Sequence, residues 1–205
     1  MAVYNVEDYI VESIDSIINQ DIGFENVQLI LVDDGTPDNS GAICDEYAQK
    51  YDNIVVIHKE NGGVSSARNA GLDVVEGQFV NFVDPDDLLT PNTLTAVYDF
   101  FSEHLDEVDI VSIPLFFFEG RNGNHALNFK YRKRTRVVDL TEEWFNPQLS
   151  LSSSFVKSEF FKNKNNRFDT RLIYAEDAQL IQKILANKQA LGLIREAKYM
   201  YRHRV

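Results

Sequence analysis

Short apolar runs alternate with segments of helical periodicity along the first hundred residues of this 205-residue chain. The runs read as buried strands at residues 27–32, 54–58 and 79–83. Helices are expected to begin at residue 6 after an N-cap at Asn5, to span 40–50, to end at residue 72, and to begin near Pro91. Strands and helices that alternate across short loops predict an α/β fold, with helices flanking a mostly parallel sheet.

Polar clusters follow three of the predicted strands. They lie at residues 33–35, 61–63 and 84–87. Parallel strands end at one edge of a sheet, and ligands of open α/β sheets bind beyond that edge. The three clusters are therefore expected to lie close together and to form a binding site.

The segment F-V-N-F-V-D-P-D-D at residues 79–87 ends in three carboxylates, those of Asp84, Asp86 and Asp87. Crowded carboxylates repel one another unless a cation compensates, and all-oxygen ligands suit Mg²⁺ or Mn²⁺. An aspartate-rich turn that caps the following helix explains the same pattern. Both interpretations stay open for this segment taken alone.

Composition excludes several classes of protein. A net charge of −12 argues against a nucleic-acid partner, which requires a basic face. The single cysteine, Cys44, allows no disulfide and fits a reducing compartment. Apolar runs fall well short of the about 18 residues that a membrane span needs. We therefore expect a cytoplasmic domain, with peripheral attachment to the inner membrane face only through regions outside this chain.

The second half of the chain departs from the alternation. A strand is expected at 109–118, a loop or hairpin turn at 119–124, and a further strand at 127–131. The basic residues at 130–136 read either as a solvated strand face or as a surface for an anionic acceptor. Serines within 149–155 fit either a sugar-binding cleft or a half-buried turn. Glu176 and Asp177 open a helical pattern, where acids are common for dipole reasons alone.

Five motifs in this order resemble those of family 2 glycosyltransferases, which have the GT-A fold. They are A-V-Y-N at 2–5, V-D-D-G-T-P-D at 32–38, N-G-G-V-S-S-A-R-N-A-G at 61–71, V-D-P-D-D at 83–87, and the Glu176-Asp177 pair. The resemblance covers nearly the whole chain. It implies a Rossmann-like GT-A sheet, although the family's first strand is truncated here because Met1 directly precedes the first motif.

The resemblance also implies a role for each matching residue. Tyr4 and Asp34 correspond to positions that hold the nucleobase and ribose, and Asn61, Gly62 and Arg68 to the loop and helix that close over the nucleotide. In the D-x-D motif, Asp84 reaches the ribose or a metal-bound water, and Asp86 ligates Mn²⁺ or Mg²⁺. Asp177 matches the catalytic base of the family, and Glu176 orients the donor sugar or the acceptor. His203 is a candidate further ligand, with a solvated histidine as the alternative.

These roles imply an inverting, metal-dependent transfer of a hexose or N-acetylhexosamine from a UDP-sugar to an acceptor hydroxyl. The expected acceptor is a glycan, a lipid-linked sugar or a polyol phosphate of bacterial capsule or teichoic acid synthesis. Residues 1–205 are expected to form one catalytic domain of a longer chain, with a nucleotide-binding half at 1–107 and an acceptor-binding half at 108–205. The alternatives are a catalytically silent GT-A module that binds a glycan or a partner chain, and a nucleotidyltransferase.

Overall fold

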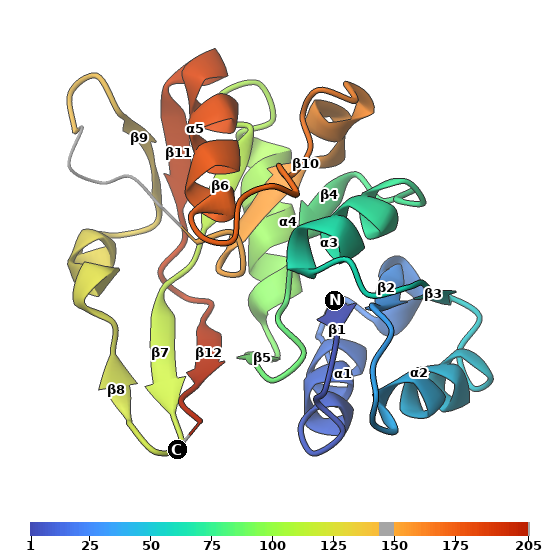
Figure 1. Cartoon of the computed structure of the whole chain (residues 1–205). Helices are drawn as coiled ribbons and strands as arrows, with labels where there is room; N and C mark the ends of the chain where they lie inside the picture. The colour runs from blue at the N-terminus through green and yellow to red at the C-terminus, as the bar shows by residue number, and fades with distance from the viewer. Residues whose placement is uncertain (144–149, 205) are drawn as a thin grey trace.

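The computed structural model describes residues 1–143 and 150–204. Its first sheet has three parallel strands in the order β1-β2-β3. These strands are β1 (Ala2–Val3), β2 (Leu29–Asp33) and β3 (Ile54–His58). The helices that alternate with them are α1 (Ile10–Ile18), α2 (Ser40–Ala48) and α3 (Val64–Leu72). These elements form the blue-to-teal part of the molecule in Figure 1.

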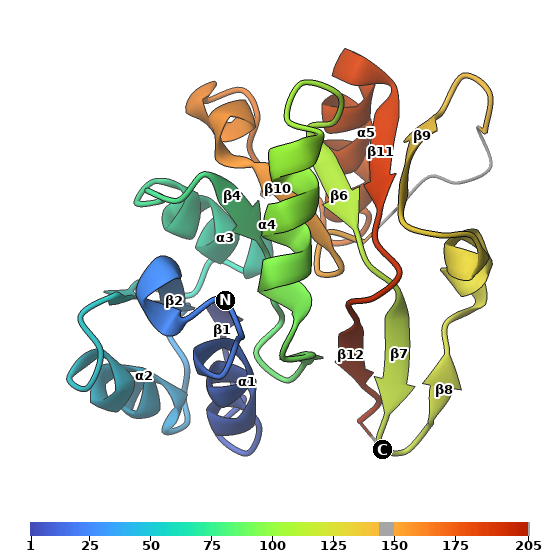
Figure 2. The same ribbon diagram turned by 180° about the vertical axis from the view of Figure 1, so that it is seen from behind.

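A five-stranded mixed sheet carries the rest of the core, in the order β4-β10-β6-β11-β9. Its strands are β4 (Phe79–Asn81), β10 (Ser154–Lys157), β6 (Ile110–Ser112), β11 (Ala190–Leu193) and β9 (Arg136–Asp139). Helix α5 (Glu176–Lys188) lies in front of this sheet in Figure 1, and α4 (Thr93–Glu103) lies in front of it in Figure 2.

The two faces of this sheet contribute to separate apolar clusters. Val111 and Phe155 pack in the cluster that contains Phe101 of α4, whereas the adjacent residues Ile110 and Val156 pack in the cluster of α5. Successive residues of a strand point to opposite faces of the sheet. A strand that is buried on both faces is therefore apolar at nearly every position. This explains why the adjacent residues Ile110 and Val111 of β6 are both apolar.

A third sheet has the order β5-β12-β7-β8. Its strands are β5 (Leu88–Leu89), β12 (Tyr199–Arg202), β7 (Leu115–Phe118) and β8 (Gly123–Asn124). Three 3₁₀ segments complete the fold: Phe24–Asn26, Ala126–Arg132 and Ser158–Lys162. Because β12 pairs with β5, the end of the chain lies beside the loop that carries the 84–87 carboxylates.

The predicted α/β fold with a parallel sheet and flanking helices is confirmed, with three local corrections. Helix α1 begins at Ile10 instead of residue 6, because the amides of Val6 and Glu7 donate to Ser40 and Asp38 at the start of α2. The strand expected at 109–118 is two strands, and Pro114, which has no N–H to donate, lies between them. Strand β4 hydrogen-bonds to β10 and joins the second sheet, not that of β1–β3.

Two further predictions in the second half need correction. Residues 126–132 form a 3₁₀ helix where a strand was expected; Lys130 is buried, but Arg132, Lys133 and Arg134 are exposed, so most of the basic residues are solvated without forming a strand face. The serine segment is a buried turn, because Ser152, Ser153 and Ser154 are at most 4% exposed. Within that segment Ser154 Oγ donates to the carbonyl of Ser150. Leu149, the first residue of the predicted segment, lies outside the described residues.

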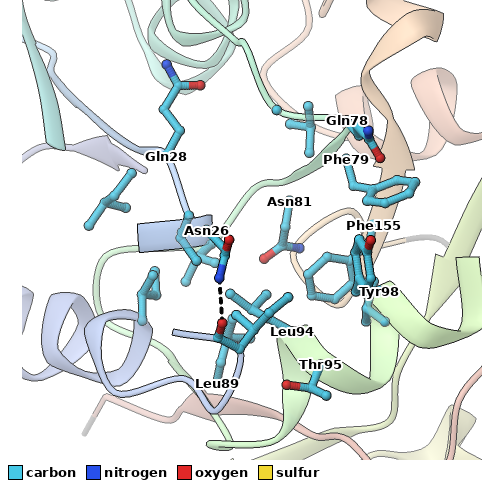
Figure 3. Close-up of a pocket in the computed structure, with 18 of the residues that line it drawn as sticks. Asn26, Gln28, Gln78, Phe79, Asn81, Leu89, Leu94, Thr95, Tyr98 and Phe155 are labelled. Atoms are coloured by element: carbon cyan, nitrogen blue, oxygen red, sulfur yellow. Dashed lines mark hydrogen bonds between the residues drawn. The ribbon is translucent and has the colours of Figure 1, made fainter. Parts of the chain in front are cut away.

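A cavity of about 650 Å³ lies between β2, β4 and α4 (Figure 3). Gln28, Phe79, Asn81 and Tyr98 are among the residues around it. Met1 also lies at this cavity, and its amino group donates to the Ile30 carbonyl at 2.8 Å. Burial lowers the pKa of that amino group to about 6. None of the predicted site residues lines the cavity.

Candidate active site

Asp34 follows β2 and is held by donors from the loop that joins β3 to α3. Its carboxylate accepts hydrogen bonds from the backbone amides of Gly62 and Gly63 at 3.0 and 2.7 Å, and Lys59 Nζ lies 2.5 Å from Oδ1. Gly63 has a φ of +83°, a conformation that glycine adopts without steric cost. The N-G-G turn therefore fixes Asp34, which is 3% exposed, at the start of α3.

Arg68 lies one turn into α3 and binds three of the predicted site carboxylates. Its Nη1 donates to Asp177 Oδ1 at 2.8 Å and to Glu176 Oε1 at 3.2 Å, and its Nη2 donates to Asp84 Oδ1 at 3.1 Å. Burial opposes the charge of this side chain, which is 9% exposed, but the surrounding carboxylates raise its pKa. One guanidinium thus brings together acids that are about a hundred residues apart in the chain.

Helix α3 is consequently the element that joins the predicted site. Its N-terminal turn holds Asp34, and its Arg68 holds Asp84 and Asp177. The expected convergence of the polar clusters is confirmed, although β4 belongs to a different sheet from β2. The clusters are brought together by helix α3, which crosses between the two sheets, and not by a shared sheet edge.

The three carboxylates of residues 84–87 point to different partners. Asp84 faces Arg68; burial raises the pKa of Asp84, an effect that Arg68 opposes and that Asp177 and Asp86 reinforce. Asp86 accepts from Arg204 Nε at 2.7 Å. Asp87 is 1% exposed and accepts from the backbone amide of Arg202 at 2.7 Å, and burial raises the pKa of Asp87 to about 7. Arginine side chains thus offset part of the repulsion among these carboxylates, and burial favours the neutral form of Asp87.

Asp177 sits in the first turn of α5, which begins at Glu176. Its second oxygen, Oδ2, accepts from the backbone amide of Leu151 at 3.1 Å. Ala175, just before the helix, has a left-handed backbone with a φ of +63°. Non-glycine residues rarely adopt this conformation, and it is held here by the surrounding structure. The turn aims both acids of α5 at Arg68.

The remaining predicted residues lie at the rim. Tyr4 is 49% exposed on the turn after β1, and Asn61 is exposed in the loop after β3. His203 is exposed, and its backbone amide donates to the Phe118 carbonyl. The basic residue that reaches Asp86 is its neighbour, Arg204.

Sequence reasoning missed three cations at the site. Lys59 pairs with Asp34, Arg204 pairs with Asp86, and Arg202 Nε donates to the Asp86 carbonyl at 2.7 Å. A basic residue two positions before the N-G-G turn, and the basic run at 202–204, were the available signals. The match of Lys59 to Asp34 needs the pairing of β3 with β2, and the match of Arg202 and Arg204 to Asp86 needs the pairing of β12 with β5.

The donor set fits a divalent cation of the Mg²⁺ or Mn²⁺ type. Asp86 offers a carboxylate whose side chain is 19% exposed, and Asp84 lies two residues away. Across residues 1–143 and 150–204, no three side chains of His, Cys, Asp or Glu form a ready metal cage. Mg²⁺ is usually held by one or two carboxylates together with waters and substrate phosphates, so the absence of such a cage is compatible with that mode.

The chain matches the family model for glycosyl transferase family 2 over residues 1–173. It therefore belongs to this family and has the GT-A architecture of its solved members. It is 52% identical to the minor teichoic acid biosynthesis protein GgaB of Bacillus subtilis strain 168, a match that covers all of this chain and 22% of GgaB. The chain thus spans about a fifth of that relative.

Solved structures agree with this assignment. Residues 1–349 of TarS from Staphylococcus aureus, solved in complex with UDP-GlcNAc, superimpose with a TM-score of 0.86 at 27% identity, covering 100% of this chain and 57% of that one. A mannosyltransferase from Pyrobaculum calidifontis, solved with GDP-Man and Mn²⁺, shares the fold with a TM-score of 0.73 at 18% identity, covering 98% of this chain and 55% of that one.

In the described part of the chain, no helix is long and apolar enough to span a bilayer.

Proposed function

We propose that this chain is the catalytic domain of an inverting glycosyltransferase that moves a hexose or N-acetylhexosamine from a UDP-sugar to a hydroxyl of a cell-surface polyol phosphate. Two relatives support the acceptor class: TarS of S. aureus is named a poly(ribitol-phosphate) β-N-acetylglucosaminyltransferase, and a Bacillus spizizenii relative is named a poly(ribitol-phosphate) β-glucosyltransferase. The UDP-GlcNAc complex of TarS supports the donor class. The reaction is assigned to the cytoplasm.

Residues 1–107 are assigned to the donor. Asp34 is a buried carboxylate with fixed orientation, suited to accept from the imide of uracil or from ribose hydroxyls. Tyr4 is exposed beside the first strand, where its ring can stack on the base, and Asn61 and Gly62 border the same turn. The donors on Asp34 are mostly backbone amides, so its orientation does not depend on mobile side chains.

Asp86 is assigned to a divalent cation, with Asp84 beside it. Such an ion stabilises the negative charge that develops on the departing diphosphate. Arg204 adds a positive charge on the Asp86 carboxylate, and Arg202 holds the backbone of the same residue. These contacts orient the Asp86 side chain at the rim of the site.

Asp177 is assigned as the base that removes the proton of the acceptor hydroxyl as the oxygen attacks the anomeric carbon. Glu176 is assigned to orientation of the sugar. Arg68 fixes the relative positions of Asp177 and Asp84, because one guanidinium donates to both. This shared guanidinium is the observation that carries the proposal, since it places the acid of α5 beside the D-x-D loop.

The test is Asp177→Asn in the full-length protein. We expect transfer to fall by about 10²–10⁴-fold, the usual contribution of a general base, with UDP affinity unchanged. Asp106→Asn, at an exposed carboxylate, is the control and should keep full activity. Full transfer by Asp177→Asn would refute the mechanism.

Calorimetry with UDP and Mn²⁺ separates the enzyme from a silent binding module. Metal-dependent UDP binding supports the enzyme, and its absence in the full-length protein supports the module. Release of UDP, not pyrophosphate, from the donor excludes a nucleotidyltransferase.

A further inference from the structure

A second cavity, of about 390 Å³, lies between β7, the 3₁₀ helix at Ala126–Arg132 and the segment that joins β11 to β12. Aromatic side chains, among them Phe116 and Phe129, form part of its wall. Three cations line it as well: Arg132, Arg195 and Lys198. None of the carboxylates assigned to the transfer reaction takes part in it.

The charge of this cavity is opposite to that of the molecule. No acidic residue is among the described residues that line it, although the chain carries 32 acidic and 20 basic residues. Arg132, Arg195 and Lys198 form no ion pair with a described carboxylate, and Lys198 instead lies over the Phe116 ring at 4.9 Å. The nearby Glu196 carboxylate accepts from Thr135 and from the backbone of Arg195. Uncompensated cations in a concave, partly apolar site raise the local concentration of anions.

A neutral donor completes the lining. His125 Nδ1 accepts from the backbone amide of Leu127 at 3.2 Å, so in the neutral ring the proton belongs on Nε2. Burial, together with the charges of Lys130 and Arg121, lowers the pKa of His125 and favours this neutral form. A neutral imidazole N–H suits a hydroxyl oxygen, whereas the three cations suit a phosphodiester.

The cavity lies on the same face of the third sheet as Asp86. Lys198 packs over Phe116, Arg202 packs over Phe118 two residues farther along the paired strand, and Arg204 then reaches Asp86. Side chains two residues apart share a face, and a rise of about 3.3 Å per residue puts about 20 Å between residues 198 and 204. Arg202 itself is engaged by Glu12 and Glu119 and is therefore not available to bind an anion.

We infer that this cavity binds a phosphodiester of the acceptor polymer, several repeats away from the hydroxyl that receives the sugar. The inference rests on the proposed function and deepens it, because it selects a polyol phosphate over a neutral lipid-linked glycan. Alternating phosphates and hydroxyls match a lining of cations and a neutral N–H donor. An extended acceptor could then be held at the cavity and at the transfer site together.

The probe is a synthetic oligo(glycerol phosphate) titrated into the full-length protein by calorimetry at low salt. The triple variant Arg132→Gln/Arg195→Gln/Lys198→Gln should bind it at least tenfold more weakly and with a smaller salt dependence. The control is Lys50→Gln/Lys162→Gln/Lys183→Gln, which removes the same charge from exposed positions elsewhere. Thermal unfolding of all three proteins verifies that each is folded.

UDP binding and hydrolysis of the UDP-sugar without acceptor, measured on the same samples, separate the two claims. If the unaltered protein neither binds UDP nor hydrolyses the UDP-sugar, the proposed function is contradicted. If UDP-sugar is consumed normally and the oligomer either fails to bind or binds equally to the cavity variant, the cavity assignment is overturned. A rise of at least tenfold in acceptor KM for the cavity variant alone, with donor KM unchanged, supports it.

Discussion

The two parts of the fold that we compare as halves, the β1–β3 sheet with its helices (residues 1–72) and the two sheets formed by β4–β12 (residues 79–202), are built on different principles. In the first, each strand of β1–β3 pairs in parallel with a neighbour close in sequence, and a helix connects each pair. In the second, β4 pairs with β10 and β5 pairs with β12, strands separated by about 70 to 110 residues. Local alternation is visible in a sequence, whereas pairing between distant strands is not. The comparison explains where sequence reasoning succeeds in this protein.

The carboxylates follow the same division. Asp34, in the first half, is held mainly by the backbone amides of a local turn. Asp84 and Asp86 are held by the side chains of Arg68 and Arg204, and Arg68 also reaches across to Asp177. Backbone amides of a turn are positioned by local conformation. The arginine contacts form only when segments distant in the sequence have come together. The two kinds of support should therefore respond differently to substitution.

The largest expected effect is that of Arg68→Met. It leaves partly buried carboxylates of both halves without their cation, and we expect the free energy of unfolding to fall by about 3–5 kcal/mol. Urea denaturation measures it. The control Arg171→Gln, at an exposed pair with Asp169, should hardly move the midpoint. Equal midpoint shifts in the two variants would mean that the guanidinium does not join the halves.

Asp34→Asn tests the carboxylate that is held by the backbone amides of Gly62 and Gly63. We expect UDP to bind about 1.5–3 kcal/mol more weakly, the usual contribution of a hydrogen bond to a charged group. Isothermal titration measures this, with the exposed Asp52→Asn as the matched control. An unaltered affinity would remove Asp34 from the nucleotide site.

A pair of Gly→Ala substitutions compares the packing of the halves. In β11 a Cβ on Gly192 would lie 2.5 Å from Phe100 Cε1, so Gly192→Ala should cost about 1–3 kcal/mol through overpacking. In α3 a Cβ on Gly71 would meet Val32 at an ordinary 3.4 Å, and Ala favours a helix over Gly by about 1 kcal/mol. Thermal unfolding should show opposite signs. A loss at both sites would contradict the expected difference in packing.

The smallest effect is expected at His58, which joins the ends of β3 and β2 to α2. Hydrogen bonds from the His58 ring to Asp33 and then to Asp45 raise the pKa of His58. A raised folded-state pKa contributes stability below the unfolded value, and this is lost as the pH rises through the folded value. His58→Gln should therefore destabilise the protein at pH 5.5 and less at pH 9. His203→Gln, without a described carboxylate partner, is the control; equal losses for His58→Gln at both pH values would exclude the linkage.

Much of the first half could be predicted from sequence, because propensity and periodicity agree with the fold there. Strand β3 matches its predicted bounds, and helix α3 ends at Leu72 as predicted. The site residues came from motifs, and the structure brings Asp84, Glu176 and Asp177 together as expected. The arginine and lysine partners could not be predicted, since a cation finds its carboxylate through tertiary pairing that leaves no local pattern.

The 3₁₀ helix at Ala126–Arg132 shows the opposite limit. Its apolar residues fit a strand pattern, but His125 caps the segment and Tyr131 donates its hydroxyl to the Ile113 carbonyl. Tertiary contacts thus override a weak local preference. The roles of the site residues, the domain halves and the metal remain proposals that the experiments above address.

Arg202, near the end of the chain, pairs with Glu12 near its beginning and stacks against Tyr9. The same side chain secures the backbone of Asp86. Closing so long a loop is entropically expensive, so this contact forms late in folding. During synthesis on the ribosome, the loop that carries Asp86 would stay loosely held until β12 has emerged.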